Sequence, residues 1–254
     1  MSDLKAVALK AVSCLDLTNL DDDCTEEDVI ALCKRAQTPH GPTAAICIWP
    51  RFVAAARTHL GDNSPIRIAT VVNFPGGMDD ADDVMALTEQ AVADGADEID
   101  MVIPWPKLIE GHDQDVSAIV GRVRRSADGA LVKAILETGM LREPDLISQA
   151  AKLAIEGGAH FIKTSTGKVP VNATLSSARL MLEAIRDSGE PVGFKPAGGV
   201  KSTNDAAAYI ALCEEIMGDG WVTPMTFRIG ASGVLTALLA TLDDDGEPTE
   251  GEGY

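Results

Sequence analysis

The amino-acid sequence predicts a single α/β domain of the TIM-barrel, or (β/α)8, class. Eight short apolar runs with strand character are each followed by a segment with helical periodicity. These runs recur at intervals that suit an eight-fold βα repeat, and 254 residues is the length of one such barrel. No G-x-G-x-x-G follows the first strand, so a doubly wound open sheet is the less favoured alternative.

The predicted elements alternate along the chain. A short amphipathic helix over residues 2–12 precedes the first strand, Ser13–Leu17, and Thr25 opens the next helix with a start that resembles a capping box. The other strands are predicted at 44–49, 66–72, 98–103, 131–136, 160–164, 192–195 and 227–230. Their helices are predicted near 50, over 79–94, near 113–126, near 144, from 174 to a stop at Gly189, near 203–217 and at 234–239.

The end of the chain differs in composition from the rest. Residues 243–254 are acidic and, apart from Tyr254, lack apolar side chains, so they are expected to form a flexible tail. The barrel domain is accordingly predicted to span residues 1–242.

Charge and composition narrow the functional classes. A formal net charge of −18 argues against nucleic acid as a partner. No apolar run approaches the roughly 18 residues of a membrane span and no signal-peptide pattern opens the chain, so a cytoplasmic location without membrane contact is expected. The five cysteines form no C-x-x-C pair and the four histidines show no ligand spacing, so neither a metal nor another cofactor is expected.

Two predicted strands carry a lysine near the strand end and continue into a loop containing glycine. Lys163 lies in the segment 160–168, and Lys195 lies in the similar segment 192–200. A buried lysine needs a partner or a purpose, because removing an ammonium group from water is costly. An edge-strand lysine that extends its ammonium to solvent is the alternative for either one alone. The repetition of the pattern favours a functional pair.

An acid is predicted to join these lysines. The segment 95–100 resembles 158–163 in sequence, which places Asp100 and Lys163 at equivalent points of two strands that face one interior. Lys133 lies on a strand flanking that of Lys163. A lysine crowded by a second ammonium loses proton affinity and becomes an amine that can attack a carbonyl carbon. A buried ion-pair network that only holds the barrel together is the structural alternative.

Glycine-containing loops follow the last three strands. Backbone N–H groups in such loops often bind a phosphate group at the end of a barrel of this class. The segments are Gly167–Lys168, Gly198–Lys201 and Gly230–Gly233. A phosphorylated ligand is therefore predicted at this end.

Five segments together resemble the deoxyribose-phosphate aldolase family over nearly the whole chain. They are 16–18, 44–48, 95–100, 161–167 and 193–200. The resemblance implies a class I aldolase that reversibly cleaves 2-deoxy-D-ribose 5-phosphate to acetaldehyde and D-glyceraldehyde 3-phosphate. It also implies that the small phosphosugar and aldehyde substrates are the partners, and that the enzyme is a homodimer.

The same resemblance implies residue roles. Lys163 matches the Schiff-base lysine, Lys195 the second lysine that lowers its pKa, and Asp100 the proton-relay acid, while Tyr254 matches a terminal tyrosine that assists proton exchange. The residues that match the lining of the cavity are Asp16, Thr18, Cys47 and Lys133. Those that match the substrate and phosphate loops are Thr166, Gly167, Lys168, Gly198, Gly199, Val200, Lys201, Gly230, Ser232 and Gly233. Lys201 stands where an arginine is often found and Gly233 where a serine is, which implies altered phosphate affinity and an unchanged substrate.

Two alternatives remain open from the sequence. Another Schiff-base aldolase with a larger donor would use the same Lys163 chemistry, and a phosphosugar-binding barrel without catalysis would use the lysines only to hold its ligand. For Tyr254 the alternative is an inert chain end.

Overall fold

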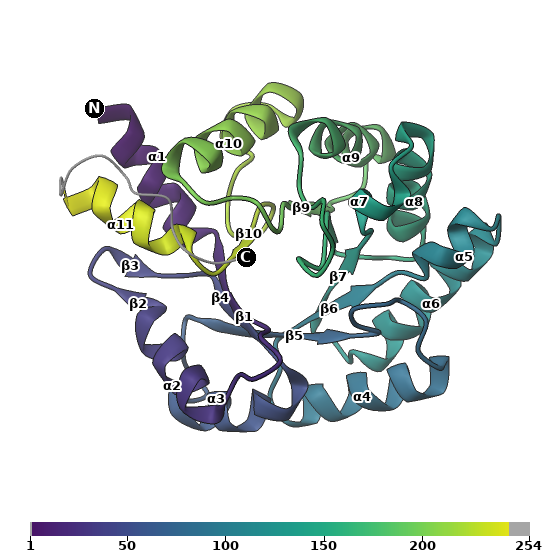
Figure 1. Ribbon diagram of the computed structural model, residues 1–254, viewed down its shortest axis with the longest axis horizontal. Helices are drawn as coiled ribbons and strands as arrows, with labels where there is room; N and C mark the ends of the chain where they lie inside the picture. Colours follow the sequence, from purple (N-terminus) through teal and green to yellow (C-terminus); the bar gives the residue numbers. More distant parts are fainter. Residues whose placement is uncertain (1, 244–254) are drawn as a thin grey trace.

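The computed structural model describes residues 2–243 and confirms the predicted TIM barrel, with a ring of strands enclosed by helices (Figure 1). The barrel strands are β1 (Leu15–Asn19), β4 (Ala45–Ile48), β5 (Arg67–Val72), β6 (Glu98–Val102), β7 (Leu131–Ile135), β8 (Phe161–Lys163), β9 (Gly193–Lys195) and β10 (Ile229–Ala231). The helices are α1 (Ser2–Ser13), α2 (Glu26–Arg35), α3 (Val53–Leu60), α4 (Ala81–Ala93), α5 (Trp105–Ile109), α6 (Asp113–Ser126), α7 (Thr138–Leu141), α8 (Pro144–Glu156), α9 (Leu175–Ser188), α10 (Thr203–Met217) and α11 (Val234–Asp243). The rest of the predicted tail, with Tyr254, lies outside the described residues.

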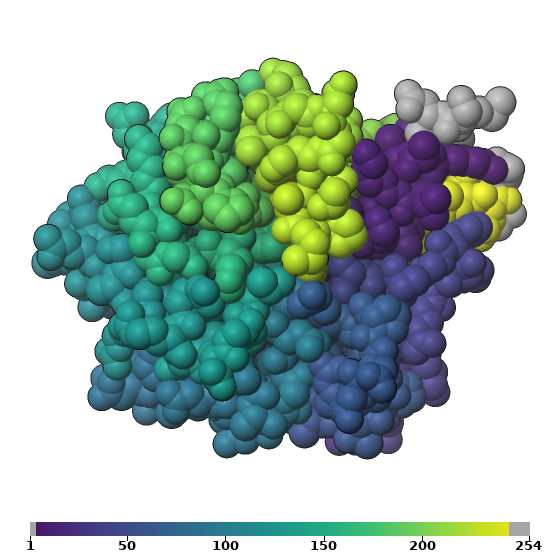
Figure 2. Space-filling view, turned by 180° about the vertical axis from the view of Figure 1, so that it is seen from behind, coloured from purple at the N-terminus to yellow at the C-terminus, as the bar shows by residue number. Residues whose placement is uncertain are grey.

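The strands pair in parallel in the order β10-β1-β4-β5-β6-β7-β8-β9. The first and last strands are neighbours, with Leu15 opposite Ile229. Between β9 and β10 the ring is completed by two isolated bridges, Phe194 with Phe227 and Ala197 with Gly230. Seen from behind in Figure 2, α1 (purple) and α11 (yellow) lie side by side, so the two ends of the described chain meet on the barrel wall.

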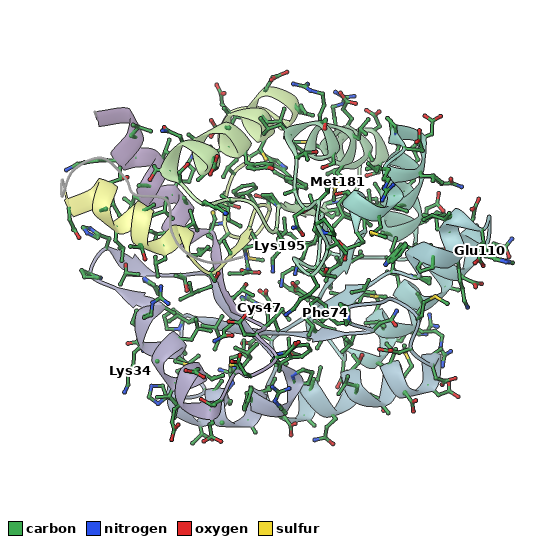
Figure 3. The ribbon with its side chains drawn as sticks, in the orientation of Figure 1. Lys34, Cys47, Phe74, Glu110, Met181 and Lys195 are labelled. Carbon is green, nitrogen blue, oxygen red and sulfur yellow. The ribbon has the colours of Figure 1, made fainter. Side chains whose placement is uncertain are left out.

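The local signals for helix ends are confirmed. Thr25 and Asp28 form a reciprocal capping box at the start of α2, and Gly189 ends α9 in the left-handed conformation with φ 70°. Helix α9 buries Ala178, Met181, Leu182 and Ile185, whereas Leu175 in its first turn is exposed, and Met181 lies on the barrel side of the helix (Figure 3). None of the helices in residues 2–243 has the length and apolar character that a membrane crossing requires.

Several boundaries differ from the prediction. Ser13 was predicted to open the first strand, but it is the last residue of α1, because the N–H of Cys14 still donates to the carbonyl of Lys10 at 3.1 Å. Gly230, the end of the predicted strand 227–230 and the start of the predicted phosphate loop, lies within β10. The elements not predicted are the hairpin of β2 (Gln37–Thr38) and β3 (Gly41–Pro42) and the short helices α5 and α7. The helix predicted near residue 50 begins as the 3-10 turn η1 (Pro50–Phe52) and continues as α3.

Two apolar regions stabilise the fold. The larger one fills the space between strands and helices. The smaller one comprises Leu20, Cys47, Ala69 and Val71, and Trp49 packs against it beside Phe74. Figure 3 labels Cys47 of β4 and Phe74, which follows β5, in this smaller region. One side of the barrel interior is therefore apolar.

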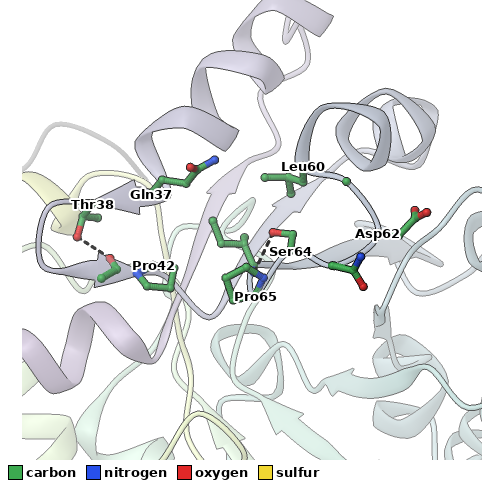
Figure 4. Close-up of a pocket in the computed structure, with 11 residues that line it drawn as sticks. Gln37, Thr38, Pro42, Leu60, Asp62, Ser64 and Pro65 are labelled. Carbon is green, nitrogen blue, oxygen red and sulfur yellow. Dashed lines mark hydrogen bonds between the residues drawn. The ribbon is translucent and has the colours of Figure 1, made fainter.

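A surface pocket of about 550 Å³ lies between the β2–β3 hairpin and the loop from α3 to β5 (Figure 4). Thr38 Oγ1 donates to the Gly41 carbonyl at 2.6 Å, and Ser64 Oγ accepts from the N–H of Ile66 at 3.1 Å. Both segments lead into strands, so the pocket lies at the N-terminal end of the barrel. Active sites of TIM barrels lie at the opposite end, and none of the predicted site residues lines this pocket.

Candidate active site

Strand register brings the predicted lysines and acid into one interior. Lys163 is the last residue of β8 and lies opposite Lys195, the last residue of β9. Asp100 of β6 lies opposite Lys133 of β7. Because side chains alternate along a strand, all four can point inward. All four are at most 1% exposed.

Asp100 is the centre of the cluster. Its Oδ2 lies 3.0 Å from Nζ of Lys163 and 2.8 Å from Nζ of Lys195, and its Oδ1 lies 2.7 Å from Nζ of Lys133. One carboxylate thus contacts three amines. Among the described residues, Asp100 is the only acid within ion-pair distance of Lys163. Asp100 also forms ion pairs with Lys133 and Lys195.

Asp16 extends the cluster toward the N-terminal end of the barrel. Its Oδ2 accepts from Nζ of Lys195 at 2.5 Å, and its Oδ1 accepts from Nη1 of Arg228 at 2.7 Å. Arg228 also forms a fork with the Glu98 carboxylate at 2.8 and 3.1 Å, and Glu98 lies 2.5 Å from Nζ of Lys133. The interior therefore holds a continuous chain of charges.

Glu98 and Arg228 were not among the predicted site residues. Glu98 lies two residues before Asp100, and Arg228 lies two residues before Gly230. Residues two apart on a strand share a face, so strand periodicity placed Glu98 and Arg228 on the inward face. The spacing of two residues from a predicted site residue was therefore the sequence signal that could have identified Glu98 and Arg228.

Two glycines make room for this interior. An added Cβ on Gly230 would lie 2.9 Å from Cε of Lys195, and one on Gly193 would lie 2.3 Å from the ring of Phe161. The Phe161 ring in turn covers the Arg228 guanidinium at 5.6 Å. Gly230, predicted to bind phosphate through its loop, therefore has a packing role beside Lys195.

The charges hold one another ionised. Burial alone would raise the pKa of Asp100 and of Asp16, but the surrounding lysines, joined at Asp16 by Arg228, lower both pKa values below their usual range. Burial alone would lower the pKa of Lys133, but the carboxylates of Asp100 and Glu98 raise it above its usual range. These groups keep their charges at neutral pH.

Thr18 and Cys47 form part of the opposite wall. They are register partners on β1 and β4, and Thr18 Oγ1 donates to the carbonyl of Asp16 at 2.9 Å. Burial, followed by the negative charge of Asp100, raises the pKa of the Cys47 thiol. Cys47 therefore presents a protonated, neutral thiol to the lysines and does not act as a nucleophile.

A buried glutamate orders the loop after β8. Glu137 accepts from the N–H of Thr166 at 3.1 Å and from Thr166 Oγ1 at 2.5 Å, and the N–H of Lys168 donates to the same Oγ1 at 3.0 Å. Burial raises the pKa of Glu137 more than these hydrogen bonds lower it. Sequence analysis missed Glu137, because its side chain reaches Thr166 from a left-handed backbone with φ 58° that no sequence signal indicated.

The loop after β9 is joined to its neighbours. The N–H of Ala197 donates to Thr164 Oγ1 at 3.0 Å, and the N–H of Gly198 donates to the carbonyl of Gly230 at 3.3 Å. Gly198 and Gly199 have positive φ values of 74° and 87°, which favour glycine.

The remaining predicted loop residues lie at the same end of the barrel. Ser232 and Gly233 follow β10 and precede α11, and Val200 is buried in the loop after β9. The N–H of Lys201 donates to Oδ2 of Asp205 at 3.0 Å. That N–H is thus used in the cap of α10, which leaves the side chain of Lys201 as the group that could reach a phosphate.

This fold and interior define a class I aldolase, in which a buried lysine on a TIM-barrel strand attacks a carbonyl group. The chain belongs to the family described as DeoC/LacD family aldolase, which its residues 10–236 match.

Known proteins agree with this assignment. A deoxyribose-phosphate aldolase from Agrobacterium fabrum is 54% identical over 247 residues, which cover 97% of this chain and 95% of that protein. A crystal structure of the apo form of a putative deoxyribose-phosphate aldolase from Toxoplasma gondii matches with a TM-score of 0.88 and 26% identity over 96% of this chain and 99% of that one. A tetrameric deoxyribose phosphate aldolase from Aeropyrum pernix shares the fold, with a TM-score of 0.74 and 22% identity over 94% of this chain and 97% of that one.

Proposed function

We propose that this enzyme reversibly cleaves 2-deoxy-D-ribose 5-phosphate to acetaldehyde and D-glyceraldehyde 3-phosphate through an imine on Lys163. The contact of Lys163 with a carboxylate that two other lysines share is the observation that carries the proposal. A buried lysine at the end of a barrel strand, beside an acid that can move protons, is placed to add to a carbonyl carbon and form an imine. The 54% identity to an enzyme of this name supports the substrate.

In the proposed reaction, the residues of the cluster act one after another. The neutral amine of Lys163 adds to the C1 aldehyde, and loss of water gives a protonated imine. Asp100 relays the proton of the C3 hydroxyl, the C2–C3 bond breaks, and its electron pair enters an enamine as glyceraldehyde 3-phosphate leaves. Protonation of the enamine carbon and addition of water then release acetaldehyde and restore the amine. Lys195, held by Asp16 and Asp100, supplies the nearby positive charge.

The phosphate group of the substrate is proposed to bind in the loops after β8, β9 and β10. Backbone N–H groups at Gly199, Ser232 and Gly233 and the side chains of Lys168 and Lys201 would hold it. Lysine at 201 offers a point charge where an arginine would offer a fork, so it selects phosphate by charge more than by geometry.

Borohydride trapping tests the function. Incubation with acetaldehyde and borohydride should reduce the imine to a stable ethyl group, and peptide mass spectrometry should place it on Lys163. Acetaldehyde should serve as donor with glyceraldehyde 3-phosphate, whereas dihydroxyacetone should not. An adduct confined to Lys133 or Lys195 would contradict the assignment, absence of any adduct would favour a binding protein, and a preference for dihydroxyacetone would indicate another aldolase.

Tyr254 is proposed to assist proton exchange at the enamine carbon, as the family resemblance implies. Tyr254→Phe is expected to slow turnover by about 10²–10⁴-fold, the usual contribution of a general acid–base group. It should leave the trapped adduct on Lys163 unchanged, because imine formation needs only the amine. The measurement is deuterium exchange of the acetaldehyde methyl group, and exchange at the wild-type rate would make the tyrosine a bystander.

We further propose how the enzyme assembles and where it works. The family resemblance implies a homodimer, and the sequence pattern implies a cytoplasmic location. Light scattering during gel filtration would distinguish a dimer from the tetramer seen in the Aeropyrum pernix relative.

A further inference from the structure

One buried acid at the mouth of the barrel has no part in the proposed reaction. Glu137 lies just after β7, is 1% exposed and has a left-handed backbone with φ 58°. A carboxyl group taken out of water needs hydrogen-bond partners. Residues other than glycine are uncommon in this conformation and often lie at functional sites. The place of Glu137 in the fold therefore calls for a functional explanation.

Both carboxylate oxygens of Glu137 bind Thr166 in the loop after β8. Its Oε1 accepts from the N–H of Thr166 at 3.1 Å, and its Oε2 accepts from Thr166 Oγ1 at 2.5 Å. The same Oγ1 accepts from the N–H of Lys168 at 3.0 Å. Gly167, between them, has φ 86°, which favours glycine. Glu137 thus fixes the turn from Thr166 to Lys168.

The backbone after Glu137 packs along the same loop. The N–H of Thr138 donates to the carbonyl of Thr164 at 2.9 Å. An added Cβ on Gly139, in α7, would collide with the carbonyl oxygen of Val171. The segment from Glu137 to Gly139 therefore supports the loop after β8 at several points, and the Glu137 side chain provides the hydrogen bonds at the turn.

This turn carries Lys168, one of the proposed phosphate ligands. The Lys168 side chain is 29% exposed, and its Nζ lies 3.6 Å from Oδ1 of Asp22, whose side chain is 92% exposed. Water screens so exposed a pair, so the ammonium group is available to a phosphate group. An added Cβ on Gly198 would lie 2.7 Å from Asn172, so the loop after β8 also contacts the loop after β9. A shift of the turn would disturb two of the proposed phosphate loops.

We propose that Glu137 is a positioning residue for the phosphate group of the substrate, acting through Thr166 on the turn that carries Lys168. This inference rests on the proposed cleavage of 2-deoxy-D-ribose 5-phosphate. Two hydrogen bonds to one residue fix Thr166, and the bond from the N–H of Lys168 to Thr166 fixes the start of Lys168. Glu137 contributes in this way to the selection of a phosphorylated substrate without touching it.

Glu137 can also act on Lys163 through its charge, and the test separates the two effects. Burial raises the pKa of Glu137, and the positive charge of Lys163 opposes this shift. Imine formation is common to substrates with and without phosphate, so an effect on Lys163 changes both rates alike. The phosphate preference is defined as kcat/KM for 2-deoxy-D-ribose 5-phosphate divided by kcat/KM for 2-deoxy-D-ribose. It reports the contribution of phosphate binding.

Two variants separate hydrogen bonding from charge, with the initial rate of acetaldehyde release measured for both substrates. Glu137→Asp keeps the charge, but its side chain is one methylene shorter and cannot hold Thr166 in the same position. Its phosphate preference should fall by about 10- to 10²-fold, since misplacement by about 1 Å can cost 10²-fold. Glu137→Gln loses the charge but keeps an acceptor for the N–H of Thr166 and a donor for its Oγ1. Its phosphate preference should stay close to the wild-type value.

A double variant tests the route through Thr166. Thr166→Val removes the hydroxyl group that joins Glu137 to the N–H of Lys168. Glu137→Asp, Thr166→Val should have a phosphate preference no lower than that of Thr166→Val, because Glu137 acts through that hydroxyl group. Losses that add in the double variant would contradict this route.

The outcomes distinguish the inference from the function on which it rests. An unchanged phosphate preference in folded Glu137→Asp, or an equal loss in Glu137→Gln, would overturn the inference. If Glu137→Asp does not fold by circular dichroism, Glu137→Met takes its place with the same expected fall, because a thioether is only a weak acceptor. A wild-type protein that cleaves neither substrate, or that shows no phosphate preference, would instead overturn the proposed function.

Discussion

Replacing Lys163 with methionine is expected to abolish turnover while leaving the folded protein at least as stable as the wild type. Loss of the nucleophile should lower turnover on the order of 10⁶-fold, as when other enzymes lose a covalent nucleophile. The fold should tolerate the change, because Asp100 keeps Lys133 at 2.7 Å and Lys195 at 2.8 Å. The variant also removes the buried amine with the fewest partners, and an apolar side chain of similar volume is often neutral or stabilising at such a site.

Lys133→Met is the matched control for this prediction. Lys133 is equally buried, but its removal takes a partner from both Glu98 and Asp100. Breaking such a buried pair should lower the free energy of unfolding by about 3–5 kcal/mol. Guanidinium denaturation of both variants at neutral pH makes the comparison. If Lys163→Met were as unstable as Lys133→Met, Lys163 would be a structural cation and its assignment as nucleophile would weaken.

Asp100→Asn is expected to damage both activity and stability. The change leaves three amines around a neutral amide that cannot balance their charge, and it removes the proposed proton relay. Turnover should fall by about 10²–10⁴-fold from loss of the relay alone. The free energy of unfolding should fall by about 3–5 kcal/mol. Asp62→Asn, at an exposed loop position, is the control and should alter neither quantity.

The contribution of Asp100 to the free energy of unfolding should depend on pH. The folded protein holds the pKa of Asp100 well below its usual value, so the carboxylate stabilises the fold above the unfolded pKa of about 4. As the pH falls below that value, the unfolded chain takes up a proton that the folded protein resists, and the stabilisation is lost. The difference in unfolding free energy between wild type and Asp100→Asn should therefore be constant from about pH 5 to 8 and shrink in acid. A difference that grows in acid would contradict the ionised state of Asp100.

Much of the barrel could be predicted because each strand is a short apolar run between helical segments. The run 131–136 corresponds to β7 at Leu131–Ile135, and the likeness of 95–100 to 158–163 placed Asp100 and Lys163 on one interior. Both inferences depend on local periodicity, which the sequence shows directly. Side chains two residues apart on a strand share a face, and the same rule could have added Glu98 and Arg228 to the cluster.

Other features depend on contacts that local sequence does not encode. Ser13 stays in α1 because the helix continues by one more hydrogen bond, which apolar periodicity cannot register. Glu137 reaches Thr166 only because its own backbone is left-handed and the strand ends beside it. The need for glycine at position 230 comes from the stem of Lys195, which occupies the space that a side chain there would fill.

The pairing of the first and last strands determines when the enzyme can be completed during synthesis. The salt bridge between Arg228 and Asp16 joins residues 212 positions apart, so it cannot form until nearly the whole chain has left the ribosome. Until β10 arrives, β1 has an unpaired edge, and the lysines that later face each other remain hydrated. Contacts of such long sequence separation form slowly, and open strand edges invite association with other chains. Arrival of the final strand therefore gives β1 its second neighbour and brings Arg228 to Asp16 and Glu98.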